Sequence, residues 1–259
     1  MTTQAEHWNG PGGERWAAAQ EEIDRSLAAI TALWLPWVAP RPTDRVLDIG
    51  CGCGTTTIEL RARAAAATGV DISEPMLAVA RRRAPELTFV CADAATLPFT
   101  STHDLIVSRF GVMFFDDPVA AFANLRTALA PGGRLAFVTW RALAENPWAT
   151  VPLAAAAGLV PPAPTADPHA PGPFAFAERA RLASILEAAG WRDVAIEPRD
   201  STMLLGETLE EAVTSALTFG PLSRLTAEVD EPTRDKIRAR LRATLTTAPA
   251  AAVWLVSAR

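Results

Sequence analysis

The sequence predicts an α/β fold in which a buried parallel sheet alternates with helices. One observation is a series of short apolar runs, and the other is the helix-length segments that separate them. The apolar runs cover residues 46–49, 68–72, 87–91, 105–108 and 135–140, and the helical segments cover about 55–65, 75–84 and 118–130. Continuous apolar runs are typical of strands buried on both faces, and parallel neighbours need a crossover helix. The pattern therefore indicates consecutive βαβ units.

A helix is expected before the first strand, over residues 16–37. Its apolar side chains recur at helical spacing, and Pro36 and Pro40 should stop it. The apolar positions are Ile23, Leu27, Ile30, Leu33 and Trp34. Residues 1–40 are therefore expected to form an N-terminal helical cap segment ahead of a core that covers residues 41–259.

The fifth strand is preceded by a strong turn signal. Pro131, Gly132 and Gly133 are expected to end the helix that carries Phe122, Leu125 and Leu129. The strand at 135–140 should then begin directly after these three residues.

The second half of the chain contains two predicted insertions into the core, at about 142–176 and 202–248. The first is an irregular segment rich in proline, with residues Pro161, Pro162, Pro164, Pro168, Pro171 and Pro173. A helix over 177–189, closed by Gly190, and a sixth strand over 194–198 follow it. The second insertion is helical over about 208–246 and precedes a last strand at 252–257.

Composition disfavours several classes of function. The 259 residues carry a formal charge of −5, and the only basic run is Arg81–Arg83, so no nucleic-acid partner is expected. No stretch is long and apolar enough for a membrane span, and a cytoplasmic protein without a membrane partner is expected. Cys51, Cys53 and Cys91 support neither a disulfide framework nor a zinc site, so no metal is predicted. The oligomeric state is left open.

The most informative segment is the run from Val46 to Gly54, an apolar strand that enters a turn with glycine at alternate positions. Glycine permits positive φ and lets a ligand approach the backbone closely. Asp71, at the end of the next strand, can accept hydrogen bonds from both ribose hydroxyls of an adenosine. The spacing departs from the G-x-G-x-x-G of nicotinamide enzymes, and Asp48 suits an ammonium group better than a pyrophosphate. The turn therefore favours a ligand with a methionine moiety.

These residues resemble class I S-adenosylmethionine-dependent methyltransferases. Asp48–Gly54 is similar to their first motif, Gly69–Ser73 to the second and Ala92–Ala94 to the third. A bacterial branch that acts on small molecules is indicated by further residues: Trp8-Asn9-Gly10 with Trp16, Ser108–Phe115, Pro118 and Pro131–Leu135. The resemblance implies a Rossmann-like seven-stranded sheet of order 3-2-1-4-5-7-6 whose last strand is antiparallel. It also implies S-adenosylmethionine as cofactor and S-adenosylhomocysteine as its product.

The resemblance assigns a role to each matching residue. Gly50 and Gly52 would contact the methionine part, Asp48 its amino group and Asp71 the ribose. Ile72 and Met76 would contact the adenine faces and Asp93 with Ala94 the adenine edge, while Ser108 and Phe110 would lie near the sulfonium. Trp16, Cys51 and Arg109 complete the expected cofactor-binding set. Structural alternatives stay open, with Asp71 a surface acid, Asp93 a helix cap, and Met76, Phe110, Phe114 and Phe115 core residues.

The acceptor is expected beyond the carboxyl ends of the strands, where the N-terminal segment and both insertions converge. Aromatic residues of these segments are candidates for an apolar pocket: Trp8, Trp16, Trp148, Phe174, Phe176 and Phe219. Methyl transfer is an in-line displacement that depends mainly on alignment, and a general base helps only where the acceptor loses a proton. The candidate bases are His7, His169 and Glu145, whereas His103 precedes the fourth strand and should lie at the opposite edge.

The sequence thus predicts methyl transfer to an oxygen, nitrogen or carbon of a small molecule, in bacterial secondary metabolism. Two rival functions share its features. A protein of this fold can bind the cofactor and catalyse another reaction, such as a cyclisation. A nicotinamide-dependent oxidoreductase is the second rival, which the glycine spacing disfavours.

Overall fold

The computed structural model describes residues 3–161, 167–226 and 229–259. They form a seven-stranded sheet in the order β3-β2-β1-β4-β5-β7-β6. The strands are β1 Arg45–Ile49, β2 Ala66–Asp71, β3 Thr88–Cys91, β4 His103–Arg109, β5 Leu129–Trp140, β6 Ala195–Thr202 and β7 Ala250–Ala258. Strands β1 to β5 pair in parallel, and β7 is antiparallel to both of its neighbours. The expected α/β fold, strand order and antiparallel last strand are confirmed.

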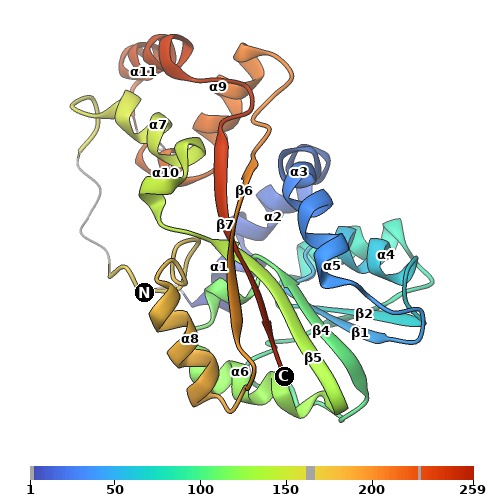
Figure 1. Ribbon diagram of the computed structural model, residues 1–259. Coiled ribbons are helices and arrows are strands. Elements are labelled where there is room, and N and C mark those ends of the chain that lie inside the picture. Colours follow the sequence, from blue (N-terminus) through green and yellow to red (C-terminus); the bar gives the residue numbers. More distant parts are fainter. Residues whose placement is uncertain (1–2, 162–166, 227–228) are drawn as a thin grey trace.

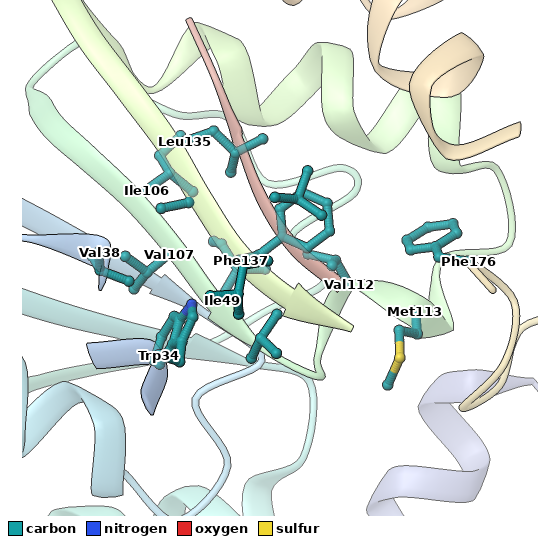
Figure 2. Close-up of a cluster of buried hydrophobic side chains, with 14 of the residues drawn as sticks. Trp34, Val38, Ile49, Ile106, Val107, Val112, Met113, Leu135, Phe137 and Phe176 are labelled. Carbon is teal, nitrogen blue, oxygen red and sulfur yellow. The ribbon is translucent and has the colours of Figure 1, made fainter. Parts of the chain in front are cut away.

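Helices cover both faces of the sheet (Figure 1). Helices α3 Gln20–Val38, α4 Thr55–Arg61 and α5 Glu74–Arg83 lie on one side, and α6 Pro118–Thr127 and α8 Arg179–Ala188 lie on the other. Large side chains of the helices and of the strands are fully buried where the two layers meet, as Figure 2 shows for Trp34 in α3 and Phe137 in β5. Burial of each such side chain contributes about 1.5–3 kcal/mol. The two packed faces hold the carboxyl ends of β1, β2 and β4 at one edge.

The N-terminal segment consists of α1 Gln4–Asn9, α2 Pro11–Ala18 and then α3. The single helix predicted over 16–37 is therefore divided at Ala19. Pro36 lies in the last turn of α3, and the helix continues for only two residues beyond it. The helix ends at Val38, where Ala39 adopts φ 48° and its N–H donates to Pro36 O at 3.2 Å.

The prediction around the fifth strand was wrong in one detail. Helix α6 ends at Thr127, and Leu129 begins β5. The pairing with β4 then jumps from Leu129 to Arg134, which leaves Pro131, Gly132 and Gly133 in a bulge. Proline has no N–H for the ladder and Gly132 adopts φ 79°, so the strand is interrupted rather than preceded by a turn.

A cap of helices stands beyond the carboxyl edge of the sheet (Figure 1). It contains α7 Pro147–Ala156, α9 Leu209–Thr218, α10 Pro221–Leu225 and α11 Glu231–Thr244. These helices share a small apolar core of their own, which includes Ala156, Ala212, Leu222, Ile237 and Leu241. Short 3₁₀ turns, η1 Val112–Phe114 and η2 Leu143–Glu145, follow β4 and β5. The boundaries expected for the N-terminal cap segment, the core and the two insertions stay predictions.

Two other points concern the chain as a whole. Pro162 and Pro164 of the proline-rich segment lie outside the described residues. Within the described part of the chain, no helix combines the length and the apolar character that crossing a bilayer requires.

Candidate functional site

The glycine turn between β1 and α4 has one packed side and one open side. A Cβ atom on Gly50 would lie 2.6 Å from the Cα of Gly111, so the turns after β1 and β4 touch backbone to backbone. A Cβ on Gly52 would meet only Met76 Sδ, at 3.8 Å. Both residues adopt positive φ, 67° and 55°. Close packing therefore explains glycine at position 50, and only Gly52 presents open backbone to a ligand.

Asp71 lies at the end of β2 and connects this turn to the next. Its Oδ2 accepts a hydrogen bond from the Gly52 N–H and its Oδ1 accepts one from the Ser73 N–H, each at 2.8 Å. The side chain is buried, which contradicts the surface-acid alternative, and burial raises its pKa while the N–H donors oppose the rise. Each oxygen keeps a second acceptor position. Two ribose hydroxyls match this geometry.

The residues expected around the adenine divide into two groups. Met76 in α5 is buried and its sulfur faces Gly52, whereas Ile72 is half-buried and its carbonyl oxygen accepts a hydrogen bond from Asn9 Nδ2. Asp93 is exposed and its Oδ1 caps a turn by accepting from the Ala95 N–H at 2.8 Å. Ala94 is buried, and its carbonyl accepts a hydrogen bond from the Asn124 side chain.

Cys51 points away from the open side of the turn. Its side chain is buried in a small cluster with Leu77 and Phe89, under α5. Burial raises the pKa of its thiol well above the usual value. Cys51 thus contributes packing, and only its backbone borders the turn.

Behind the turn, Asp48 and Arg109 form the centre of a buried polar cluster. Asp48 Oδ2 accepts hydrogen bonds from Thr56 Oγ1 at 2.5 Å and Thr57 Oγ1 at 2.7 Å. Its Oδ1 is buried and has no partner among the described residues. Burial raises the pKa of Asp48 to about 6, although the two threonine hydroxyls and the charge of Arg109 lower it. An unpartnered buried carboxylate oxygen fits a ligand that brings an ammonium group.

Arg109 connects this cluster to the N-terminal helix α3. Its Nη1 donates to Thr31 Oγ1 at 2.7 Å, and its Nη2 lies 3.8 Å from Asp24 Oδ1. Burial lowers the pKa of Arg109, and Asp24 and Asp48 oppose that effect. The guanidinium at the end of β4 is suited to hold the carboxylate of an amino-acid moiety. Neither Thr31 nor Asp24 has a sequence signal, because only the packing of α3 across the sheet brings them here.

The N-terminal segment is fastened beside the proposed ribose site. Asn9 Nδ2 donates to Ile72 O at 2.9 Å, and Asn9 Oδ1 accepts from the Glu74 N–H at 3.0 Å. Ser73 Oγ donates to Trp8 O at 2.6 Å. Gly13 in α2 lies so close that a Cβ there would be 2.5 Å from Ser73 Oγ. Helices α1 and α2 therefore lie over the residues that follow Asp71.

Aromatic rings surround the end of β4. Phe110 adopts φ 65°, which is rare for a non-glycine residue, and its ring stacks on Trp140 at the end of β5 with centroids 4.3 Å apart. Trp140 in turn packs on Trp148 in α7, with ring centroids 4.8 Å apart. Strain of this kind persists where the surroundings enforce it, often at functional sites. Trp140 was missed from sequence, although its position at the carboxyl end of a predicted parallel strand is a usable signal.

The other aromatic candidates lie in different places. Trp8 packs on Phe114 at 5.2 Å and on Trp16 at 5.9 Å, and Trp16 is exposed. Phe174 packs against Trp148. Phe176 is fully buried against Phe122, so it does not line a pocket, and half-buried Phe115 also packs against Phe122. Phe219 is half-buried after α9.

Ser108 is also structural in its contacts. It is fully buried, and its Oγ accepts hydrogen bonds from the N–H groups of Gly111 and Val112, at 3.1 and 3.3 Å. It thereby shapes the turn that carries Phe110. Its expected position near the sulfonium stays a prediction.

The candidate bases are widely separated. Glu145 is exposed and engaged by Arg141 and the Ala142 N–H, and His169 lies on an exposed loop near Asp167 and Glu178. His7 is half-buried with its ring 5.0 Å from that of Trp8; burial and the charges of Arg224 and Arg15 lower its pKa. His103 begins β4, at the opposite edge. Only His7 adjoins the aromatic residues around β4.

Comparison with known proteins identifies the family. A family model described as a methyltransferase domain matches residues 46–133. A demethylmenaquinone methyltransferase of Beutenbergia cavernae is 31% identical over 168 residues, which cover 60% of this chain and 68% of that protein. The chain is a class I S-adenosylmethionine-dependent methyltransferase. The turn that presents Gly52, the acceptor oxygens of Asp71 and the free oxygen of Asp48 fit the cofactor of that family.

Solved structures show the same fold for this methyltransferase. Phosphoethanolamine N-methyltransferase 2 of Haemonchus contortus, in complex with S-adenosylmethionine, superposes with a TM-score of 0.59 at 17% identity and covers 98% of this chain and 59% of its own. A [4+2]-cyclase, SpnF, superposes with a TM-score of 0.55 at 18% identity and covers 89% and 80%. At these identities the likeness concerns the fold alone.

Proposed function

We propose that this methyltransferase transfers a methyl group to an oxygen, nitrogen or carbon of a small-molecule acceptor, in bacterial secondary metabolism. The observation that carries the proposal is the aromatic enclosure at the end of β4, where strained Phe110 stacks on Trp140. Aromatic faces bind apolar and planar molecules and exclude water. The related protein from Beutenbergia cavernae is named for demethylmenaquinone, which also supports a small-molecule acceptor.

The proposed cofactor site combines the open side of the glycine turn with the buried polar cluster behind the turn. Gly52 contacts the methionine part and Asp71 holds the ribose, with Met76 and Ile72 against the adenine and Asp93 and Ala94 at its edge. Asp48 and Arg109 balance the charges of the amino-acid end, where Asp48 Oδ1 is the unpartnered buried acceptor. Trp16, which packs on Trp8, completes the proposed set.

The chemistry proposed for the chain is alignment. The cofactor supplies an electrophilic methyl group on a positively charged sulfur. Phe110 is half-buried with one face against Trp140, and its other face can stabilise a nearby cation by about 0.5–2 kcal/mol and keep water away. Correct orientation of two reactants contributes about 7–11 kcal/mol, which exceeds what one general base adds. His7 is separated from Phe114 by the ring of Trp8, so a direct proton transfer is not part of the proposal.

A second candidate function is a cyclisation that uses the same enclosure without methyl transfer. The superposition on a [4+2]-cyclase supports this second candidate, because that protein shares the architecture. Such a reaction would also depend on an apolar cavity that orients its substrate.

The test begins with calorimetry, in which S-adenosylmethionine should bind at micromolar to millimolar concentration. A panel of phenols, amines and activated carbon acids is then incubated with enzyme and cofactor. Mass spectrometry should find a product in which one hydrogen is replaced by methyl, together with S-adenosylhomocysteine. An isomerised substrate without formation of S-adenosylhomocysteine would support the cyclisation function. Absence of cofactor binding would refute both functions.

The role of His7 has its own measurement. A general base contributes about 100- to 10,000-fold to a rate, whereas a residue of the pocket rim contributes less. We expect His7→Gln to lower kcat less than about tenfold and to leave the pH profile unchanged. A loss above about 100-fold, with an inflection removed from the profile, would show that His7 accepts the proton.

A further inference from the structure

A groove between the N-terminal helices and the cap carries a concentration of positive charge. It has a volume of about 350 Å³ and is lined by Arg15 of α2 and by Arg234 and Arg238 of α11, with hydroxyl side chains Ser223 and Thr226 beside α10. Among the described residues that line it, none is acidic. This is unusual for a chain whose formal charge is −5. We call this the arginine groove.

The arginines of the groove differ in how they are held. Arg234 Nη2 donates to Thr226 O at 3.0 Å and its Nη1 lies 3.7 Å from Glu231 Oε2, while Arg238 Nη1 donates to Glu231 and Asp235 of the same helix. Each of these contacts uses only part of a guanidinium with five N–H donors. Arg15 is exposed and has no ion pair within the described part of the chain, and the same holds for Arg224 nearby. Both lower the pKa of His7, which lies next to the groove.

Both sides of the arginine groove continue into the aromatic enclosure. On the N-terminal side, Arg15 is followed by Trp16, which packs on Trp8 and through it on Phe114. On the cap side, a Cβ at Gly220, at the start of α10, would lie 3.4 Å from the Trp148 ring. Trp148 leads through Trp140 to Phe110. From residues that flank the groove on both sides, a series of ring contacts therefore leads to the aromatic residues at the end of β4.

A neighbouring groove has the opposite charge. It measures about 390 Å³ and is lined by Glu22, Glu207, Glu210, Glu211 and a single arginine, Arg25. Thr214 of α9 lines both grooves, so the sign of the charge changes across one helix. An anion is attracted to the arginine groove and repelled from its neighbour, which fixes its direction of binding.

We propose that the acceptor of this enzyme carries an anionic group, a carboxylate or a phosphate, which the arginine groove binds while the apolar reacting end lies against Phe110 and Phe114. The inference rests on the proposed function, because it uses the same enclosure. Guanidinium groups bind both kinds of anion with paired hydrogen bonds, and such charge-assisted bonds are about twice as strong as neutral ones.

The experiment compares three probes of one shape on enzyme saturated with S-adenosylhomocysteine. Naphthoate, naphthyl phosphate and neutral naphthamide are titrated by calorimetry at low and at high salt. We expect one of the two anions to bind about tenfold more tightly than naphthamide at low salt, with the preference reduced by salt. The tighter anion identifies the natural group. Equal affinity for all three probes would overturn the inference.

Two variants and one matched control locate the effect. Arg15→Gln, which removes a lining arginine, should weaken binding of the anion by several-fold. Arg224→Gln, which removes a charge outside the lining, should weaken it less, and both variants should bind naphthamide as the unchanged enzyme does. Arg25→Gln removes an exposed arginine from the acidic groove and should change neither the affinity for the anion nor that for naphthamide. An equal loss of anion affinity in Arg25→Gln would show that only the net charge matters, and it would refute anion binding in the arginine groove. Because S-adenosylhomocysteine binding is measured first, its failure would refute the proposed function, whereas failure of the anion preference alone would refute only this inference.

Discussion

Replacement of Asn9 by alanine tests whether the N-terminal segment covers the bound cofactor. Asn9 makes two hydrogen bonds to the main chain beyond β2, to Ile72 O at 2.9 Å and from the Glu74 N–H at 3.0 Å. Bonds at a solvent-accessible position contribute about 0.5–1 kcal/mol each. Their loss therefore weakens the attachment of α1 and α2 by about 1–2 kcal/mol, which corresponds to about 5- to 30-fold in an equilibrium constant.

The assay is the release of S-adenosylhomocysteine, followed by stopped-flow tryptophan fluorescence because Trp8 and Trp16 adjoin the site. The release rate should rise about 5- to 30-fold in Asn9→Ala with little change in the association rate. Thr3→Ala is the control: it removes the N-cap of α1, where Thr3 Oγ1 accepts from the Glu6 N–H, without touching β2. Unchanged release from Asn9→Ala, or an equal increase in Thr3→Ala, would refute the idea that this attachment retains the cofactor.

The remaining predictions concern the turn and the acids around it. Gly50→Ala should destabilise the fold by several kcal/mol in urea, because the new Cβ meets Gly111 Cα at 2.6 Å, whereas Gly52→Ala should cost only about 1 kcal/mol but abolish cofactor binding in calorimetry. Equal effects of the two on stability would contradict the open side at Gly52. Asp71→Ala should weaken cofactor binding by about 1–3 kcal/mol, and unchanged affinity would remove the ribose assignment. The pKa of Asp48, about 6 in the fold, lies above its ordinary value of 3.8, so ionisation of this acid lowers stability as pH rises through that interval. Thr57→Val removes a hydrogen bond to the ionised form and should therefore destabilise the fold by about 1 kcal/mol more at pH 8 than at pH 5 in urea titrations, and a loss independent of pH would count against it.

Most of the sheet was predictable because its strands carry local signals. The apolar runs match β1 to β5, and the glycine turn with Asp71 marked the edge where the cofactor residues meet. The errors fall where the local signal was ambiguous. Proline and glycine at 131–133 were interpreted as a helix end, but pairing with β4 incorporates them into β5 as a bulge.

What the sequence by itself determined is the family chemistry, since a glycine turn and an acid on the next strand need only local order along the chain. The roles of individual side chains were decided by tertiary structure. Gly50 is required by Gly111, 61 positions along the chain, and Arg109 is held by Thr31, 78 positions back. The arginine groove likewise joins α2 to α11. Such contacts depend on how helices pack across the sheet, and no periodicity or motif in one sequence encodes that packing.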